Sequence, residues 1–151
     1  MAATTITNDA AQYGVSIDGT YYTDIIWTSL KRSFSVLDTE NTGRTVADGR
    51  MHRDIIGTYY NYTLGLKAKI GAEAQYDTVY DILSAPTASH RVILPYGQGT
   101  ITFDAYVTGG DDELIRTKKV VQTTNGTETR AARWHNLEVN FIAMQRARVA
   151  T

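Results

Sequence analysis

The chain has 151 residues, of which 42% are hydrophobic and 10% aromatic, a composition typical of one globular domain with its own core. Fifteen basic and sixteen acidic residues give a net charge of −1, so no strong overall field attracts nucleic acid or a membrane surface. The absence of cysteine excludes disulfides, thiol nucleophiles and thiolate-rich zinc sites.

Residues 1–9 combine neither the basic start nor the apolar stretch of a secretory signal. No apolar run approaches the roughly 20 residues that cross a bilayer as a helix. We therefore expect a protein that is made and kept in the cytoplasm, unless a larger particle carries it out.

The first half of the chain alternates between apolar and polar residues, as half-buried strands do. Residues 13–17 and 21–26 flank Asp18 and Gly19, a dipeptide that tolerates the positive φ angles of a tight hairpin turn. The alternation continues through residues 30–37. We expect a hairpin followed by a third strand.

The segment 38–54 is polar and rich in turn-forming residues, which predicts a long exposed loop. Loops of this length in compact domains are usually functional or disordered. Mixed charges and glycines suit an arm that becomes ordered against a neighbouring subunit, and a loop without a partner is the alternative. Under the first hypothesis, the residues expected at the contact between subunits are Arg44, Asp48, Arg50, Met51 and Arg53.

The clearest strand pattern covers residues 56–70, where seven apolar residues share one parity. They are Ile56, Tyr60, Tyr62, Leu64, Leu66, Ala68 and Ile70. About sixteen residues at about 3.3 Å each would span roughly 50 Å, which exceeds an ordinary strand. We therefore expect a bend or bulge near Gly57 or Gly65.

One helix is predicted over residues 72–84, where Tyr76, Val79, Tyr80 and Leu83 follow helical spacing. This apolar stripe should pack on a sheet.

Further strands are predicted at 91–95, 99–107, 114–122 and 132–145, the last alternating about Leu137, Val139, Phe141 and Ala143. Turns are expected at 109–112 and 125–126. About eight strands and one helix, without a linker, predict a single domain over residues 1–151. The fold class is mainly β, an antiparallel barrel or sandwich with one helix covering one side.

No arrangement of residues indicates catalysis. His52, His90 and His135 lack metal-ligand spacing and are expected at the surface or at strand ends. Asp77 and Asp81 lie on the polar face of the predicted helix and are expected in solvent. The serines lack the motif of an activated nucleophile. We assign no catalytic, metal-binding or cofactor-binding residue, and we expect the chain not to be an enzyme.

Ten tyrosines are present, and strand propensity with cross-strand packing explains most of them. The alternative is a carbohydrate-binding β-sandwich in which Tyr59, Tyr60 and Tyr62 stack on sugars. That hypothesis predicts a monomer.

Two stretches, Ala47 to Ile56 (ADGRMHRDII) and Trp134 to Ile142 (WHNLEVNFI), enclose a long strand, a lone helix and more strands. This order of elements resembles the small tail proteins of long-tailed bacteriophages and prophages, especially the tail-tube and baseplate-tube group. The resemblance implies two orthogonal antiparallel sheets closing into a small barrel, with a flanking helix and an extended loop.

In that family, six subunits commonly join their sheets into a ring whose centre passes DNA. The resemblance therefore implies a virion protein, made in the host cytoplasm, that forms stacked hexameric rings serving DNA ejection. The implied partners are further copies, other tail proteins, and DNA in non-specific passage, with no membrane. The loop 38–54 would reach the adjacent subunit or ring, and the strand 56–70 would form part of the wall. A tail-tip, tail-terminator or head–tail joining protein is the alternative within the same class.

Overall fold

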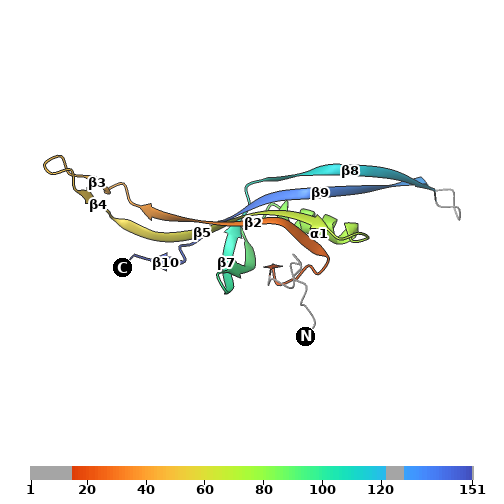
Figure 1. Ribbon diagram of the computed structural model, residues 1–151, viewed down its shortest axis with the longest axis horizontal. Helices are drawn as coiled ribbons and strands as arrows, with labels where there is room; N and C mark the ends of the chain where they lie inside the picture. Colours follow the sequence, from red (N-terminus) through yellow and green to blue (C-terminus); the bar gives the residue numbers. More distant parts are fainter. Residues whose placement is uncertain (1–14, 122–127, 151) are drawn as a thin grey trace, which may run out of the picture.

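The computed structural model describes residues 15–121 and 128–150 and shows a mainly β protein with one helix (Figure 1). The elements are β1 (Ser16–Ile17), β2 (Ile25–Asp38), β3 (Gly43–Arg44), β4 (Met51–His52), β5 (Ile55–Ala68), α1 (Glu73–Leu83), β6 (His90–Tyr96), β7 (Gly99–Tyr106), β8 (Gly110–Val121), β9 (Glu128–Ala143) and β10 (Arg148–Val149). An antiparallel sheet of about eight strands with one helix confirms the predicted fold class.

Four strands form a long sheet in the order β2, β5, β9 and β8, and every neighbouring pair is antiparallel. One row of residues across this sheet consists of Leu30, Leu64, Val139 and Gly110. The short strand β10 pairs with the first part of β5, at Gly57 and Thr58. The long sheet therefore runs through the whole molecule.

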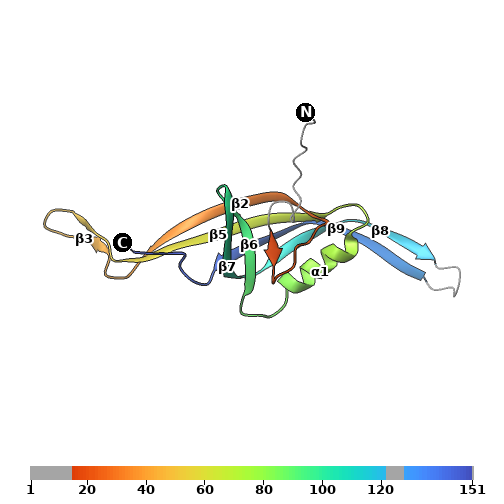
Figure 2. The ribbon, with the colours of Figure 1, turned by 90° about the horizontal axis from the view of Figure 1, so that it is seen from below.

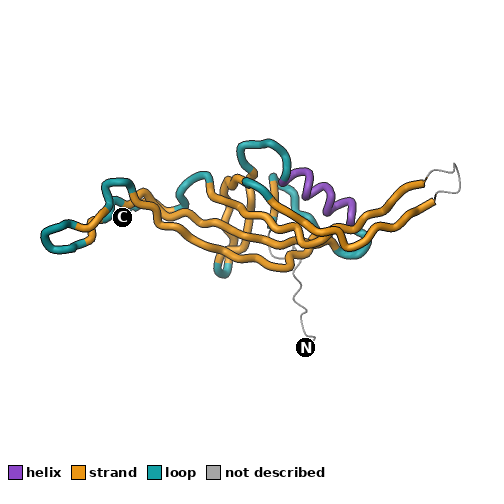
Figure 3. Tube along the Cα trace, turned by 90° about the horizontal axis from the view of Figure 1, so that it is seen from above, coloured by secondary structure: helices purple, strands orange, loops and turns teal. Residues whose placement is uncertain are grey.

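A second sheet, β1, β6 and β7, joins the first at the end of β9, where Ala105 lies opposite Ala143. In Figure 2, β6 and β7 run across the direction of β2, β5 and β9. The helix and this second sheet cover the same face of the long sheet, which we call the inner face (Figures 2 and 3). The arrangement is a sandwich of crossed sheets.

The core lies on the inner face and follows the predicted alternation. Its members include Tyr62, Leu64, Leu66, Leu137, Val139 and Phe141 of the long sheet, Val92 and Leu94 of β6, and Tyr76, Val79 and Leu83 of α1. Two apolar residues behave differently from the prediction. Ile70 is 88% exposed because β5 ends at Ala68 and the chain turns at Gly71, whose φ is 87°. Tyr80 is also exposed.

The expected irregularities occur at both predicted glycines. The register between β2 and β5 shifts at Thr28, opposite Gly65, and again at Ile56, next to Gly57. A Cβ atom at Gly65 would lie 2.5 Å from the Thr28 hydroxyl oxygen, and one at Gly57 would collide with the backbone oxygen of Arg148. Glycine at each position therefore permits the close approach of a neighbouring strand.

One turn prediction holds only at the turn itself, and another is wrong. Asp18 and Gly19 form the expected tight turn, with φ of 51° and 86° and two backbone hydrogen bonds between Ile17 and Thr20, but β1 and β2 do not pair with each other beyond it. The Asp18 carboxylate instead contacts β6, accepting a hydrogen bond from the Arg91 amide at 2.9 Å, and it lies 2.7 Å from His90 Nδ1. Residues 109–112 are not a hairpin turn, because β8 begins at Gly110 and pairs with β9 rather than β7. The turn expected at 125–126 lies outside the described residues.

A hydrogen bond ties the helix to the long sheet: the buried Tyr76 hydroxyl donates to Asp112 Oδ2 at 3.0 Å. Burial, together with this bond, raises the pKa of Tyr76.

We expect Tyr76→Phe to lower the free energy of unfolding by about 1–2 kcal/mol in urea denaturation, because a buried bond to a charged acceptor is lost. Tyr80→Phe is the matched control on the exposed side of the same helix, with an expected change below about 0.5 kcal/mol. Equal losses in the two variants would contradict this assignment.

Candidate functional site

Two projections extend beyond the core at opposite ends of the long sheet (Figure 1). The β2–β5 arm consists of residues 31–38 and 55–60 with the β3–β4 hairpin at its end, and the β8–β9 arm consists of residues 114–121 and 128–134. Residues 31–37 of β2 are exposed on both faces. Large apolar side chains nevertheless occur on the two arms: Phe34, Val36, Leu37, Val46 and Met51 on the first, and Leu114, Ile115 and Trp134 on the second. Exposed apolar residues gathered in this way mark interaction surfaces.

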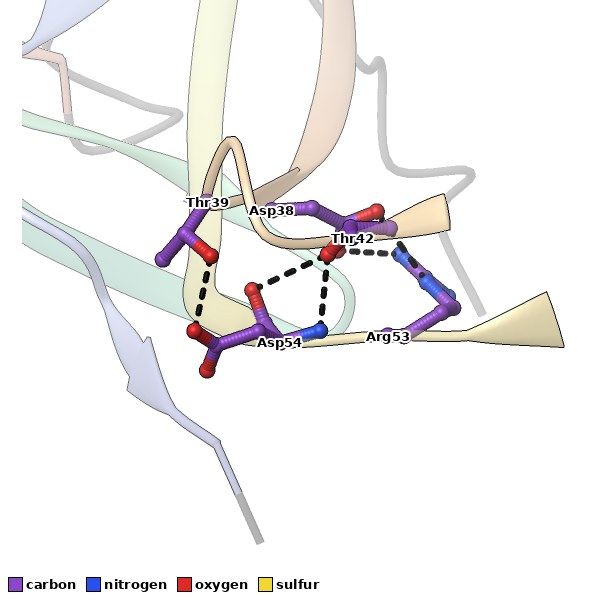
Figure 4. Close-up of polar contacts among 5 residues, drawn as sticks. All are labelled: Asp38, Thr39, Thr42, Arg53 and Asp54. Carbon is purple, nitrogen blue, oxygen red and sulfur yellow. Dashed lines mark hydrogen bonds and ion pairs between the residues drawn. The ribbon is translucent and has the colours of Figure 1, made fainter. Parts of the chain in front are cut away.

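The segment 38–54 is not the long loop that was predicted, because its two sides are hydrogen-bonded to each other. Strands β3 and β4 pair within it, and the Thr39 amide donates to the Asp54 backbone oxygen at 2.7 Å. Figure 4 shows the polar contacts at its base. The Thr39 hydroxyl donates to the Asp54 carboxylate at 2.7 Å, and Arg53 donates two bonds to Asp38 at 2.9 and 3.2 Å. Hydrogen bonds between polar side chains therefore hold the two sides of this segment together, whereas buried apolar side chains hold the strands of the core.

The turn of this hairpin is also ordered locally. The Asp48 carboxylate accepts hydrogen bonds from the Thr45 hydroxyl and from the Arg50 amide, and these bonds lower the pKa of Asp48. Gly49 supplies a φ of 67°, and its backbone oxygen accepts a bond from the Arg44 guanidinium at 3.0 Å. The conformation of the hairpin is therefore set by hydrogen bonds within the chain itself.

The five residues predicted at a subunit contact differ in whether the structure gives their side chains a partner within the hairpin. Three of them, Arg44, Asp48 and Arg53, have partners inside the hairpin, as described above. The side chains of Arg50 and Met51 are exposed. Sequence reasoning missed Val46, an apolar side chain fully exposed in the turn. A contact of these residues with another subunit stays a prediction.

A cleft of about 540 Å³ opens on the inner face where the β2–β5 arm leaves the core. Its lining consists of Arg32, Ser33, Phe34, Val36, Thr58, Tyr60, Tyr96 and Arg148. Phe34, directly opposite Tyr60 in the register, is 70% exposed. The cleft therefore combines two guanidinium groups with aromatic rings and contains no carboxylate.

Two phenols interact in this cleft. The Tyr96 hydroxyl donates to the Tyr60 oxygen at 3.1 Å, and the Arg32 guanidinium lies 5.4 Å from the centre of the Tyr96 ring. Hydrogen bonds from Tyr96 and Arg148 lower the pKa of Tyr60, and the bond that Tyr96 donates raises the pKa of Tyr96. Tyr60 is therefore the phenol of the pair that loses its proton first.

The three tyrosines proposed as a sugar-stacking surface do not lie together. Tyr62 is buried, and its hydroxyl donates to the Pro95 oxygen at 2.7 Å. Tyr59 lies on the opposite face of β5, because neighbouring residues of a strand alternate. Tyr60 alone reaches the cleft, where its aromatic neighbour is Tyr96 of the second sheet.

The histidines do not come together. His52 is exposed on β4, and His135 Nε2 lies 3.5 Å from a carboxylate oxygen of Glu113. His90 begins β6 as a strand-end residue, but it is only 5% exposed beside Asp18. Asp77 and Asp81 are exposed, as predicted. Within residues 15–121 and 128–150, no group of three metal-binding side chains is found, and no helix is long and apolar enough to cross a membrane.

The long sheet has two open edges. In the part of the chain that the structure describes, β2 pairs only with β5, and β8 pairs only with β9. Each edge therefore presents backbone amides and carbonyls that another strand can bind. Edges of this length are usually covered or blocked in monomeric proteins.

The local order of the hairpin can be tested at Asp48. We expect Asp48→Ala to raise hydrogen–deuterium exchange several-fold in residues 43–52, because two bonds across the turn are lost, with the melting temperature unchanged. Glu40→Ala is the control, an exposed acidic residue in the same segment. Unchanged exchange in Asp48→Ala would show that the hairpin does not depend on this carboxylate.

The phenol pair can be tested by following tyrosine ionisation through ultraviolet absorbance. Tyr60→Phe should remove the part of the titration that occurs at lowest pH. Tyr96→Phe should move that part to higher pH, because the hydrogen bond that stabilises the Tyr60 phenolate is lost. If Tyr96→Phe leaves the early part where it is, the proposed direction of the bond is wrong.

Comparison with known proteins adds no family to this geometry. A scan against protein-family models gives no match, and a search of curated proteins finds no similar sequence.

Proposed function

We propose that this protein is a structural subunit that assembles with copies of itself, as the tail-tube subunit of a bacteriophage virion. Copies would form rings of about six subunits, and stacked rings would form the conduit for DNA during ejection. The observation that carries the proposal is the long sheet: within the described residues, β2 and β8 each pair on one side alone, which leaves an open edge at both sides of the sheet.

Strand directions favour a head-to-tail contact between copies. Neighbouring strands alternate in direction from β2 to β8, so β2 and β8 run oppositely. When two copies lie side by side in the same orientation, β8 of one meets β2 of the next as an antiparallel pair. Such a contact uses two different surfaces, and it generates a ring when the rotation between copies closes.

The arms support the same proposal. They carry exposed apolar residues far from the core, and the β3–β4 hairpin is held by its own hydrogen bonds. A preformed hairpin loses little conformational freedom when it binds a neighbour. It would contact the adjacent subunit or ring, with Val46, Arg50 and Met51 as its outward side chains.

A tail-tip, tail-terminator or head–tail joining protein would use the same surfaces in a single ring. A second candidate function, a carbohydrate-binding module, is favoured by one observation, the aromatic cleft around Tyr60 and Tyr96. It predicts a monomer whose tyrosine fluorescence responds to oligosaccharides, so oligomeric state distinguishes the two functions.

Assembly can be tested by negative-stain microscopy and native mass spectrometry of the purified chain over a concentration series. The proposal predicts rings of about six subunits or tubes at high concentration. A variant in which an Asn-Gly turn replaces residues 43–52 should retain the circular dichroism of the full chain but fail to form rings or tubes. Full rings from the shortened variant would exclude the hairpin from assembly, and a strict monomer of the full chain at every concentration would contradict the proposal.

A further inference from the structure

The two open edges of the long sheet carry opposite charges. The β2 edge has two consecutive cations, Lys31 and Arg32, and the β8 edge has three consecutive carboxylates, Asp111, Asp112 and Glu113. Asp111 lies directly opposite Glu138 on β9, so two like charges face each other there. Like charges in this position are destabilising unless a cation approaches them.

Each charged residue has a defined face. Arg32 lies opposite the buried Tyr62, and Asp112 is bound by the Tyr76 hydroxyl, so both point to the inner face. Their neighbours in sequence, Lys31 on β2 and Glu113 on β8, point to the outer face, because side chains alternate along a strand. The pairing of β2 with β5 is regular over residues 30–34. The register of β8 against β9 shifts between Asp111 and Glu113, where two steps along β8 match three steps along β9, so the extra residue belongs to β9 and not to the β8 edge.

We propose that residues 30–34 of β2 bind residues 110–114 of β8 in a second copy of this chain, in the register that places Arg32 opposite Asp112 and Lys31 opposite Glu113. The partner is a second copy because the chain itself carries the complementary edge. This inference rests on the proposed function, self-assembly, and specifies its contact.

Only this register satisfies both faces. It sets Lys31 against Glu113 and Ser33 against Asp111 on the outer face. On the inner face it sets Leu30 against Leu114, and it places the Phe34 ring over Gly110. A shift of two residues in one direction brings Asp112 against Leu30, and a shift in the other direction brings Arg32 against Leu114. Both shifts leave a charge beside an aliphatic side chain, which costs free energy on burial.

The register also fits closure of a ring. Within one copy, Leu30 aligns with Leu64, Val139 and Gly110, and Gly110 would align with Phe34 of the next copy. Followed across the four strands of one copy, the row that begins at residue 30 of β2 arrives at residue 34 of β2 in the next copy. This is an offset of about four residues for every four strands. The same ratio of offset to strand number, eight for eight, gives strands in a TIM barrel a tilt of about 36°. The register that matches the side chains on both faces therefore also has the ratio of offset to strand number found in a closed barrel.

Charge reversal tests the contact in the full chain. Lys31→Glu and Glu113→Lys should each raise the concentration needed for assembly at least tenfold, and the two together in one chain should restore it. Lys67→Glu is the matched control, since Lys67 is exposed on β5, away from both edges. Single variants that assemble like the wild type, or a double variant that fails to recover, would overturn the proposal while self-assembly stands.

Cross-linking tests the register directly, since the chain has no cysteine of its own. Ser33→Cys with Asp111→Cys should give a ladder of disulfide-linked oligomers under mild oxidation. Ser35→Cys with Asp111→Cys, displaced by two residues, should not, because the Cβ atoms would lie too far apart. A ladder from the displaced pair alone would overturn this register. A wild-type chain that stays monomeric at every concentration would overturn both this inference and the proposed function.

Discussion

The pairing of β5 with β9 is the interaction on which the rest of the structure depends. Its register sets Tyr62 against Phe141, Leu64 against Val139, and Leu66 against Leu137, so six side chains of the core come from one pair of strands. The helix and the second sheet pack on this apolar face. A shift of one residue would turn these side chains outward, which fixes the register of the whole sheet. Because β2 and β8 flank this pair, the same register determines which residues lie at the open edges.

Much of the fold could be predicted from sequence because burial on one face leaves a repeating pattern. The alternation in residues 62–68 and 137–143 and the helical spacing from Tyr76 to Leu83 identify their elements correctly. The pairing of the strands could not be predicted, because an alternating pattern identifies a strand but does not indicate which other strand lies beside it. The turn at Asp18 illustrates this limit. It has the φ angles of a hairpin, but its carboxylate binds His90 and Arg91 on a distant strand.

The candidate site was less accessible to sequence reasoning. The hairpin at the end of the β2–β5 arm has no apolar alternation. It is held together by hydrogen bonds that the carboxylates of Asp38, Asp48 and Asp54 accept, one of them from the Thr39 hydroxyl. Composition therefore suggested a loop. The cleft was missed because Tyr60 and Tyr96 belong to different sheets. The charge match between the two edges was hidden for a similar reason, because it requires knowledge of which strands end the sheet and which face each residue occupies.

In the proposed assembly, neighbouring copies cover the open edges of β2 and β8. Hydrogen–deuterium exchange of the assembled protein against the dilute monomer measures this directly, because an edge amide that gains a partner becomes protected. We expect slower exchange on assembly at residues 30–34 and 110–114, with exchange in the buried part of β5 unchanged. Assembly without protection at either edge would contradict it.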